Sequence, residues 1–176
     1  FDAKMKKELI ARGSRSYFQS SYGDSIKQKV DVEVSFKNSE ENNLGMPLPK
    51  GVIRLYKKDS GGSLQFIGED RIDHTPRNEE VRLVVGEAFD VVAERRQTSY
   101  KKLADKLIET SWELTVKNRK KDETVTVSFL EDVYGDWEVV SSTGEYKKTS
   151  AFGLRFDITA APDEEKKVAF TIRSRF

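Results

Sequence analysis

Hydrophobic and polar residues alternate along much of this chain. In the segment 26–36, Ile, Val and Phe fill nearly every even position, while Lys, Asp, Glu and Ser fill the odd ones. A period of two predicts a β-strand with one buried and one solvated face. The same alternation recurs over 79–85, 89–95, 108–117, 124–130, 152–159 and 168–173, and shorter strands fit 137–141 and 145–149.

Turn residues separate these segments at short intervals. Asp59-Ser60-Gly61-Gly62 lies between the short apolar segments 52–57 and 63–68, which predicts a β-hairpin in which Leu64 and Phe66 share one face. Gly86-Glu87 is the expected tight link between the strands on either side of it, and the proline-containing stretch 44–51 should be an extended connector. The prediction is therefore an all-β, antiparallel β-sandwich of immunoglobulin-like architecture with about eleven strands.

Two segments allow a different interpretation. Residues 99–107 fit either a short helix or a strand, and that choice stays open. Residues 2–11 look helical, because Met5, Leu9 and Ile10 fall at helical spacing, so one short N-terminal helix is expected. We expect an N-terminal segment at 1–25 that could end an upstream helical region, a first β module at 26–98 and a second at 99–176. The two modules could also form one domain.

A weak internal sequence repeat supports the idea of two modules. The strand that ends Val34-Ser-Phe-Lys-Asn38 is matched by Leu114-Thr-Val-Lys-Asn118, and a polar loop and another strand follow each. Such hairpins arise readily by convergence, so duplication remains one of two explanations. The charged stretch 117–123 is read as a hairpin loop.

Composition agrees with a folded β protein. The chain has 176 residues with 31 Lys and Arg against 30 Asp and Glu, and its 36% hydrophobic content is too high for a disordered chain. Val, Ile and Thr total 34 against 20 for Ala and Leu, which favours strands. No apolar stretch is long enough to span a bilayer as a helix, so a soluble domain is expected.

The missing residue types exclude several chemistries. With no Cys and one His, the chain offers no disulfide, no thiolate metal site and almost no imidazole chemistry, and we expect no metal and no cofactor. No Gly-x-Ser-x-Gly elbow or phosphate-binding glycine loop is present. Carboxylate pairs such as Glu131-Asp132 could serve glycoside hydrolysis, but their sequence neighbourhood is unspecific. An enzyme is thus less favoured than a binding domain.

Four residues remain as weak candidates for a binding site. His74, beside Asp73, could be an oriented base, although a backbone-bonded residue in a turn fits the following Pro76 better. Trp137 could plug one end of a sandwich or stand exposed for a sugar or a protein partner. Lys120 and Lys121 belong to the densest basic cluster, yet neighbouring acidic residues favour a solvated loop over a nucleic-acid site.

Several strings together resemble a known family. They are Leu-Gly-Met-Pro-Leu-Pro-Lys-Gly at 44–51, Gly-Ser-Leu-Gln-Phe-Ile-Gly-Glu-Asp-Arg-Ile-Asp-His-Thr-Pro at 62–76, Gly-Glu-Ala-Phe-Asp-Val-Val at 86–92 and Tyr-Gly-Asp-Trp-Glu at 134–138. In this order they resemble the C-terminal conserved domain of unknown function in uncharacterised bacterial proteins, some labelled mucoidy-inhibitor-like. The resemblance covers about residues 26–176.

The resemblance implies a β-rich domain behind a region of coiled-coil character, often in an exported protein. It carries no established activity, cofactor or catalytic residue, although the His74 motif belongs to its pattern. We therefore predict a non-catalytic interaction module of a larger exported, extracytoplasmic or periplasmic protein, with a protein or cell-envelope component as partner. The alternatives are a carbohydrate-active or hydrolytic domain that uses carboxylates and exposed aromatic residues, and a structural role bracing the upstream coiled coil.

Overall fold

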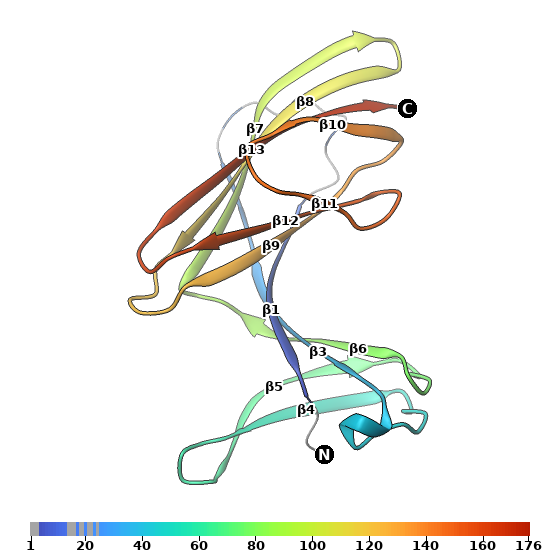
Figure 1. The fold of residues 1–176 in the computed structure, drawn as a ribbon, viewed down its shortest axis with the longest axis vertical. Coiled ribbons are helices and arrows are strands. Elements are labelled where there is room, and N and C mark those ends of the chain that lie inside the picture. The colour runs from blue at the N-terminus through green and yellow to red at the C-terminus, as the bar shows by residue number, and fades with distance from the viewer. Residues whose placement is uncertain (1–3, 14–16, 18–19, 21–22, 24) are drawn as a thin grey trace. The chain divides into compact units, whose positions relative to one another are not determined.

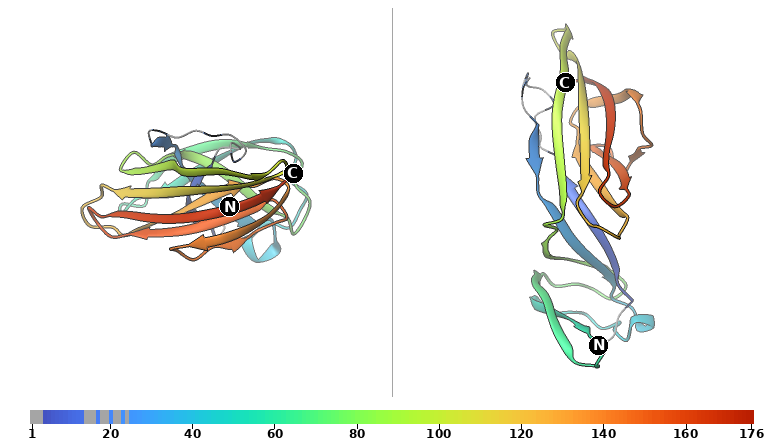
Figure 2. Two further views of the ribbon diagram at one scale, coloured as in Figure 1. Left: turned by 90° about the horizontal axis from the view of Figure 1, so that it is seen from above. Right: turned by 90° about the vertical axis from the view of Figure 1, so that its left-hand side faces the viewer.

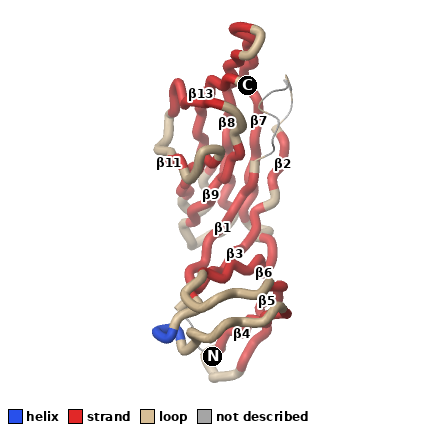
Figure 3. The backbone as a smooth tube through the Cα atoms, turned by 90° about the vertical axis from the view of Figure 1, so that its right-hand side faces the viewer, coloured by secondary structure: helices blue, strands red, loops and turns tan. Residues whose placement is uncertain are grey.

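The fold is almost entirely β (Figure 1). A computed structural model describes residues 4–13, 17, 20, 23 and 25–176. Within these residues the chain forms thirteen strands, β1 to β13, and its one helical segment is the 3₁₀ turn Glu40–Asn42, drawn in blue in Figure 3. The predicted all-β class with antiparallel sheets packed on one another is confirmed.

The helix expected at 2–11 is wrong for the residues that the structure describes. Residues Lys6–Arg12 form strand β1, which pairs in parallel with β9 from Leu9↔Val127 to Arg12↔Leu130. Ile10 and Ala11 are buried in this position. A short apolar segment is ambiguous on its own, and a ladder with a strand over a hundred residues away decides between helix and strand.

The chain divides into two compact units, which we describe separately. Unit 1 comprises residues 1–8 and 31–87, and unit 2 comprises residues 9–30 and 88–176. The expected division at 98/99 falls inside β7 (Val91–Ala104), a single continuous strand. The residues on either side of unit 1's main segment are joined, because the Ala88 N–H donates to the Val30 carbonyl over 2.8 Å.

Unit 2 is a β-sandwich whose strands can be followed in Figure 2. In one sheet β9 lies between β1 and β12, and β11 follows β12; the other sheet has the order β10-β13-β8-β7-β2. The further bounds are β2 (Ile26–Gln28), β8 (Leu107–Asn118), β9 (Val125–Asp132), β10 (Asp136–Ser142), β11 (Lys147–Lys148), β12 (Gly153–Ala160) and β13 (Glu165–Arg175).

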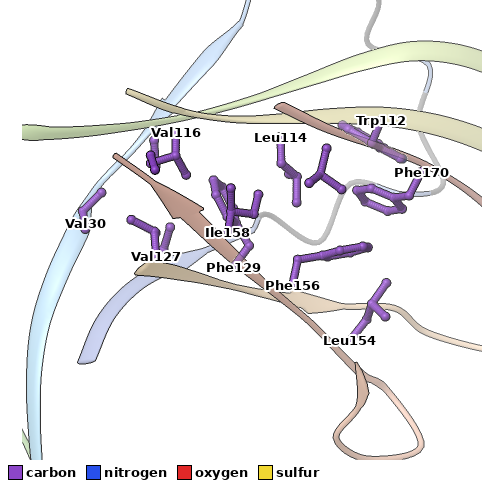
Figure 4. Packing of buried hydrophobic residues seen from close by; sticks show 14 of the residues in the cluster. Val30, Trp112, Leu114, Val116, Val127, Phe129, Leu154, Phe156, Ile158 and Phe170 are labelled. Carbon is purple, nitrogen blue, oxygen red and sulfur yellow. The ribbon is translucent and has the colours of Figure 1, made fainter. Parts of the chain in front are cut away.

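The inward faces of these two sheets form the larger core. Figure 4 shows Trp112, Leu114 and Val116 of β8 on one side and Val127, Phe129, Leu154, Phe156 and Ile158 of β9 and β12 on the other. The Phe156 and Phe170 rings lie 4.6 Å apart between the sheets. Each of these strands presents every second side chain inward, which is the alternation read from the sequence.

Two sequence predictions are settled by the pairing in unit 2. Residues 99–107 are not helical, because β7 continues to Ala104 and pairs with β8 as far as Ala104↔Leu107. The segment 117–123 is not a hairpin loop. Strand β8 pairs with β7 and β13, whereas β9 pairs with β1 and β12, so this loop crosses from one sheet to the other.

Unit 1 contains two pairs of antiparallel strands. Strand β3 (Val30–Lys37), whose residues from Asp31 on lie in this unit, pairs with β6 (Glu80–Glu87), and β4 (Gly51–Lys58) pairs with β5 (Leu64–Ile72). The predicted 26–36 strand is thus interrupted at Lys29. The predicted 52–68 hairpin is confirmed, whereas β6 runs through Gly86-Glu87, where a tight link was expected.

The two strand pairs of unit 1 enclose a small core. Val34, Phe36, Leu55, Val81 and Leu83 are buried there. Gly68 of β5 lies so close to β6 that a Cβ atom would stand 2.6 Å from the Val85 carbonyl oxygen. The Asp70 carboxylate accepts the Val84 N–H over 2.7 Å, so β5 is fixed against β6 by packing and by a side chain.

Candidate functional site

The β4–β5 hairpin of unit 1 has two faces of different character. Ile53 and Leu55 of β4 and Gly68 of β5 point toward the small core. A bulge follows, because Leu55 pairs with Gly68 while the next residue, Tyr56, pairs with Phe66, which leaves Ile67 as the extra residue. Alternation along β4 places Val52, Arg54, Tyr56 and Lys58 on the other face.

That other face carries an exposed apolar surface. On this face Val52, Tyr56, Leu64 and Phe66 are all exposed, Leu64 by 62% and Phe66 by 56%. We call these four residues the apolar hairpin face. The rings of Tyr56 and Phe66 meet edge to face with their centroids 5.7 Å apart, so the largest side chains hold each other in place.

Charged residues lie within and beside the apolar hairpin face. The Arg54 Nε donates to the Glu69 carboxylate over 2.9 Å, which pairs the two strands in the middle of the face. Lys57 and Lys58 follow Tyr56 at the end of β4, and among the described residues neither lies within ion-pair distance of a carboxylate. The hairpin therefore offers an apolar surface that shares its face with Lys58, next to Lys57, and within the described part of the chain no carboxylate pairs with either lysine.

The turn at 59–62 sets the end of this hairpin. The Asp59 carboxylate accepts hydrogen bonds from the Gln65 side chain and from the Ser63 and Gly61 N–H groups, at 2.9 to 3.2 Å. These donors hold the pKa of the Asp59 carboxyl below its usual range. Gly62 adopts a φ of +85°, a conformation that glycine accepts without strain.

His74 lies in a separate shallow depression of unit 1. The depression has a volume of about 460 Å³ and is lined by Pro47, Leu48, Pro49, His74, Thr75 and Pro76. The His74 Nδ1 accepts the Lys50 N–H over 3.3 Å, while the Asp73 carboxylate pairs with the Lys50 ammonium at 3.5 Å. His74 is thus bonded to backbone, as the turn interpretation predicted, and Asp73 contacts Lys50.

Trp137 is buried in unit 2, as the first of its two interpretations predicted, and its ring is not exposed for a ligand. Its side chain is buried, its indole N–H donates to the Ala151 carbonyl over 2.8 Å, and the Lys148 ammonium lies 4.2 Å from the ring centroid. The exposed aromatic residues nearby are Tyr134 and Phe152, whose rings stack at 5.6 Å.

Two lysines of the basic cluster are paired with carboxylates where the structure places them. Lys120 pairs with Glu123 at 2.6 Å, and that hydrogen bond raises the pKa of Lys120. Lys117 pairs with Glu94 on β7 at 2.8 Å. Lys121 is exposed in the loop that crosses between the sheets. These contacts do not gather the lysines with His74, which belongs to unit 1.

A buried charged cluster lies within unit 2. The Arg95 Nε is 3.1 Å from both carboxylate oxygens of Glu131, the Tyr17 hydroxyl donates to that carboxylate, and the guanidinium stacks 3.5 Å from the Trp112 ring. Arg95 and Glu131 are each 1% exposed. Burial raises the pKa of the Glu131 carboxyl and of the Tyr17 hydroxyl. Glu131, a carboxylate candidate in the sequence, is therefore enclosed in the interior of unit 2 and paired with Arg95.

Sequence reasoning identified the hairpin but not its exposed face. Leu64 and Phe66 were placed on one face correctly, and nothing in their pattern distinguished a face toward core from one toward solvent. The sequence of the neighbouring strand β4 does contain a usable signal. Ile53 and Leu55 alternate with Val52 and Tyr56, so both faces of β4 carry apolar residues. A hairpin that is apolar on both faces buries one of them and leaves the other without a partner.

The described residues contain neither a metal-binding cluster nor a membrane-spanning helix. Among the described residues, no three His, Asp or Glu side chains are grouped as a metal site would require, and no helix there has the length and apolar character to cross a membrane. No family model, curated protein or solved structure matches this chain.

Proposed function

We propose that this chain is a non-catalytic β-sandwich interaction module that binds a protein partner through the apolar hairpin face. The single observation that carries the proposal is the placement of four exposed large apolar side chains on one face of one hairpin. Scattered exposed apolar residues are ordinary on a protein surface, whereas contiguous ones mark interaction sites.

The energetics of this face favour association. Full burial of an exposed large apolar side chain is worth about 1.5–3 kcal/mol, and the four side chains of this face, which are 48–62% exposed, can gain about half of that each. Aromatic residues provide a large share of binding energy at interfaces between proteins. Tyr56 and Phe66 already contact each other, so little side-chain freedom remains to be lost on binding.

The positions of the polar candidates support a non-catalytic role. Glu131 is enclosed with Arg95 and Tyr17, and His74 uses Nδ1 to accept a backbone N–H. Lys120 is engaged with Glu123, which supports a partner other than a nucleic acid. The resemblance to a domain of exported bacterial proteins supports a partner in the cell envelope and a position outside the cytoplasm.

Site-specific photocrosslinking tests this function. A photoreactive phenylalanine analogue replaces Phe66 in the full chain, which is produced in cells that naturally make the protein. We expect a discrete crosslinked protein that disappears when Tyr56→Ser is added. The matched control carries the analogue at Phe89, which is 90% exposed in unit 2.

Two outcomes would contradict the proposal. The same products at positions 66 and 89 would show collisional labelling, and the absence of any product specific to position 66 would leave the apolar hairpin face without a partner. The melting temperature of each variant checks that the fold is retained.

The stacked Tyr134–Phe152 pair favours a second candidate function, carbohydrate binding by unit 2. Both rings are partly exposed, and exposed aromatic rings stack on sugars. An oligosaccharide panel tests it, with binding expected to be lost in Tyr134→Ala/Phe152→Ala and kept in Tyr56→Ser/Phe66→Ser. A wholly negative panel would contradict it.

A further inference from the structure

We propose that the partner of the apolar hairpin face is an extended acidic protein segment that adds to the free edge of β4 as a third strand. This inference rests on the proposed function and specifies the partner's chemistry. It follows from the backbone pairing of β4, from its charge and from the spacing of its exposed side chains.

The free edge comes from the topology of unit 1. Strands β4 and β5 form a two-stranded sheet, so within the described part of the chain β4 has a ladder partner on one side only. The other strand, β5, lies against β6 through Gly68 and Asp70. The edge of β4 is therefore where a further strand can add its main-chain hydrogen bonds.

The charge of β4 selects the added strand. Gly51–Lys58 contains Arg54, Lys57 and Lys58 and no carboxylate. Glu69 satisfies Arg54 from the neighbouring strand, whereas Lys57 and Lys58 have no such partner among the described residues. Directly opposed charges of opposite sign stabilise strand pairs and like charges destabilise them, so carboxylates opposite these two lysines are favoured.

The spacing of exposed apolar residues specifies the rest of the segment. Val52 and Tyr56 lie on the same face of β4, and Phe66 extends that surface across the ladder. A strand added to β4 presents every second side chain to the same face. The ligand is thus an extended segment with alternating apolar residues and with Asp or Glu at the end that lies beside Lys57 and Lys58.

A second copy of this chain is the less favoured occupant. Pairing of β4 with another β4 would bring together two strands that each carry three cations and no carboxylate. Lysine on an edge strand is a common means of preventing such pairing. The same charge that opposes self-association favours an acidic strand.

Selection from a library of random ten-residue peptides displayed on phage, against the full chain, tests this partner. We expect enriched peptides to be acidic with apolar residues at every second position. In fluorescence anisotropy their affinity should fall about tenfold or more in Lys57→Glu/Lys58→Glu and weaken with added salt. The matched control, Lys101→Glu/Lys106→Glu, alters two exposed lysines in the β7–β8 hairpin of unit 2 and should change affinity less than twofold.

The result separates this inference from the proposed function. Peptides that require Tyr56 and Phe66 but show no excess of Asp or Glu would overturn the acidic partner and leave the interaction module standing. Dimerisation of the chain that is abolished by Tyr56→Ser/Phe66→Ser would also overturn it. No enriched peptide that requires Tyr56 and Phe66 would count against both. Protection of β4 amides from hydrogen exchange by the bound peptide is expected, and unchanged exchange there would exclude strand addition.

Discussion

The two units use their apolar residues in different ways. Unit 2 buries a cluster of twenty hydrophobic residues among those described, enclosed by two sheets. Unit 1 buries a cluster of five and exposes four on the outer face of the same hairpin that covers its core. Unit 2 thus has the larger enclosed core, and unit 1 has a small core beside one apolar hairpin face; exposed apolar side chains such as Phe89 and Phe152 occur on unit 2 as well.

The difference indicates where function can be sought. A large enclosed core tolerates little change, because its side chains are packed at high density. A small two-layer unit with an unpaired edge gains stability from any strand that binds it, since ligand binding to the folded state stabilises that state. The following experiments test this contrast, from the largest expected effect to the smallest.

Removal of one partner of the buried pair in unit 2 should have the largest effect. Arg95→Met leaves the Glu131 carboxylate buried without its cation, and the free energy of unfolding should fall by about 3–5 kcal/mol. Urea denaturation measures it. The control Arg96→Met, which breaks the more exposed Arg96–Glu113 pair, should cost about 1 kcal/mol or less. Equal losses would mean that the buried Arg95–Glu131 pair contributes no more to stability than the more exposed Arg96–Glu113 pair.

Substitutions of adjacent residues on β4 should affect stability differently, because the two residues lie on opposite faces of the hairpin. Leu55→Ala creates a cavity in the small core and should cost about 2–5 kcal/mol. Tyr56→Ser removes an exposed ring pair and should cost about 1 kcal/mol or less in stability. Thermal denaturation followed by circular dichroism compares them. A Tyr56→Ser loss as large as that of Leu55→Ala would show that the apolar hairpin face is part of a core.

Substitution of Asn38 and of Asn118 tests whether the two units use the same local structure at the short repeated sequence that ends in these residues. Each side chain is fully buried at the end of a strand, and each holds a loop by accepting one backbone N–H and donating to two or more carbonyls. Substitution by Ala should cost roughly 1–3 kcal/mol at either position, because buried groups lose their partners. Hydrogen exchange should place the loss in unit 1 for Asn38 and in unit 2 for Asn118. Identical protection patterns in the two variants would contradict separate units.

The smallest effect concerns pH and the turn of the hairpin. The pKa of Asp59 is lower in the folded chain than in the unfolded chain, so the stability its carboxylate adds is complete above the unfolded pKa and is lost as the pH falls through the folded one. The Ser63 and Gly61 amide proton shifts should therefore titrate with an acidic midpoint, as measured by NMR. Asp59→Asn should abolish this titration, and its persistence would assign it to another group.

Much of the fold follows from alternation in the sequence. The strands around Leu114, Phe129 and Phe156 and the hairpin at 52–68 were predictable because each has a local period of two or a strong turn. The helix predicted near Met5 failed because the segment is short and its strand partner is distant. The crossing between sheets at 117–123 was not predictable, since local pattern does not reveal which strand pairs with which.

The buried ion pair can be recognised in the sequence once the strands are known. Arg95 shares the parity of Val91 and Ala93, and Glu131 shares that of Val127 and Phe129. An Arg and a Glu that each occupy an inward position on predicted strands indicate an internal ion pair. The exposure of the apolar hairpin face depends on where unit 1 places its other strand pair, which alternation does not specify.

The hydrogen bond between Ala88 and Val30 has an evolutionary consequence. The main segment of unit 1 leaves and re-enters unit 2 at two residues already in contact, so residues 31–87 have the form of an insertion within a sandwich. A segment with adjacent ends can change in length while its host keeps the ladders among its own strands. Under the proposed function, the binding surface of unit 1 can therefore vary among descendants while the sandwich of unit 2 is kept.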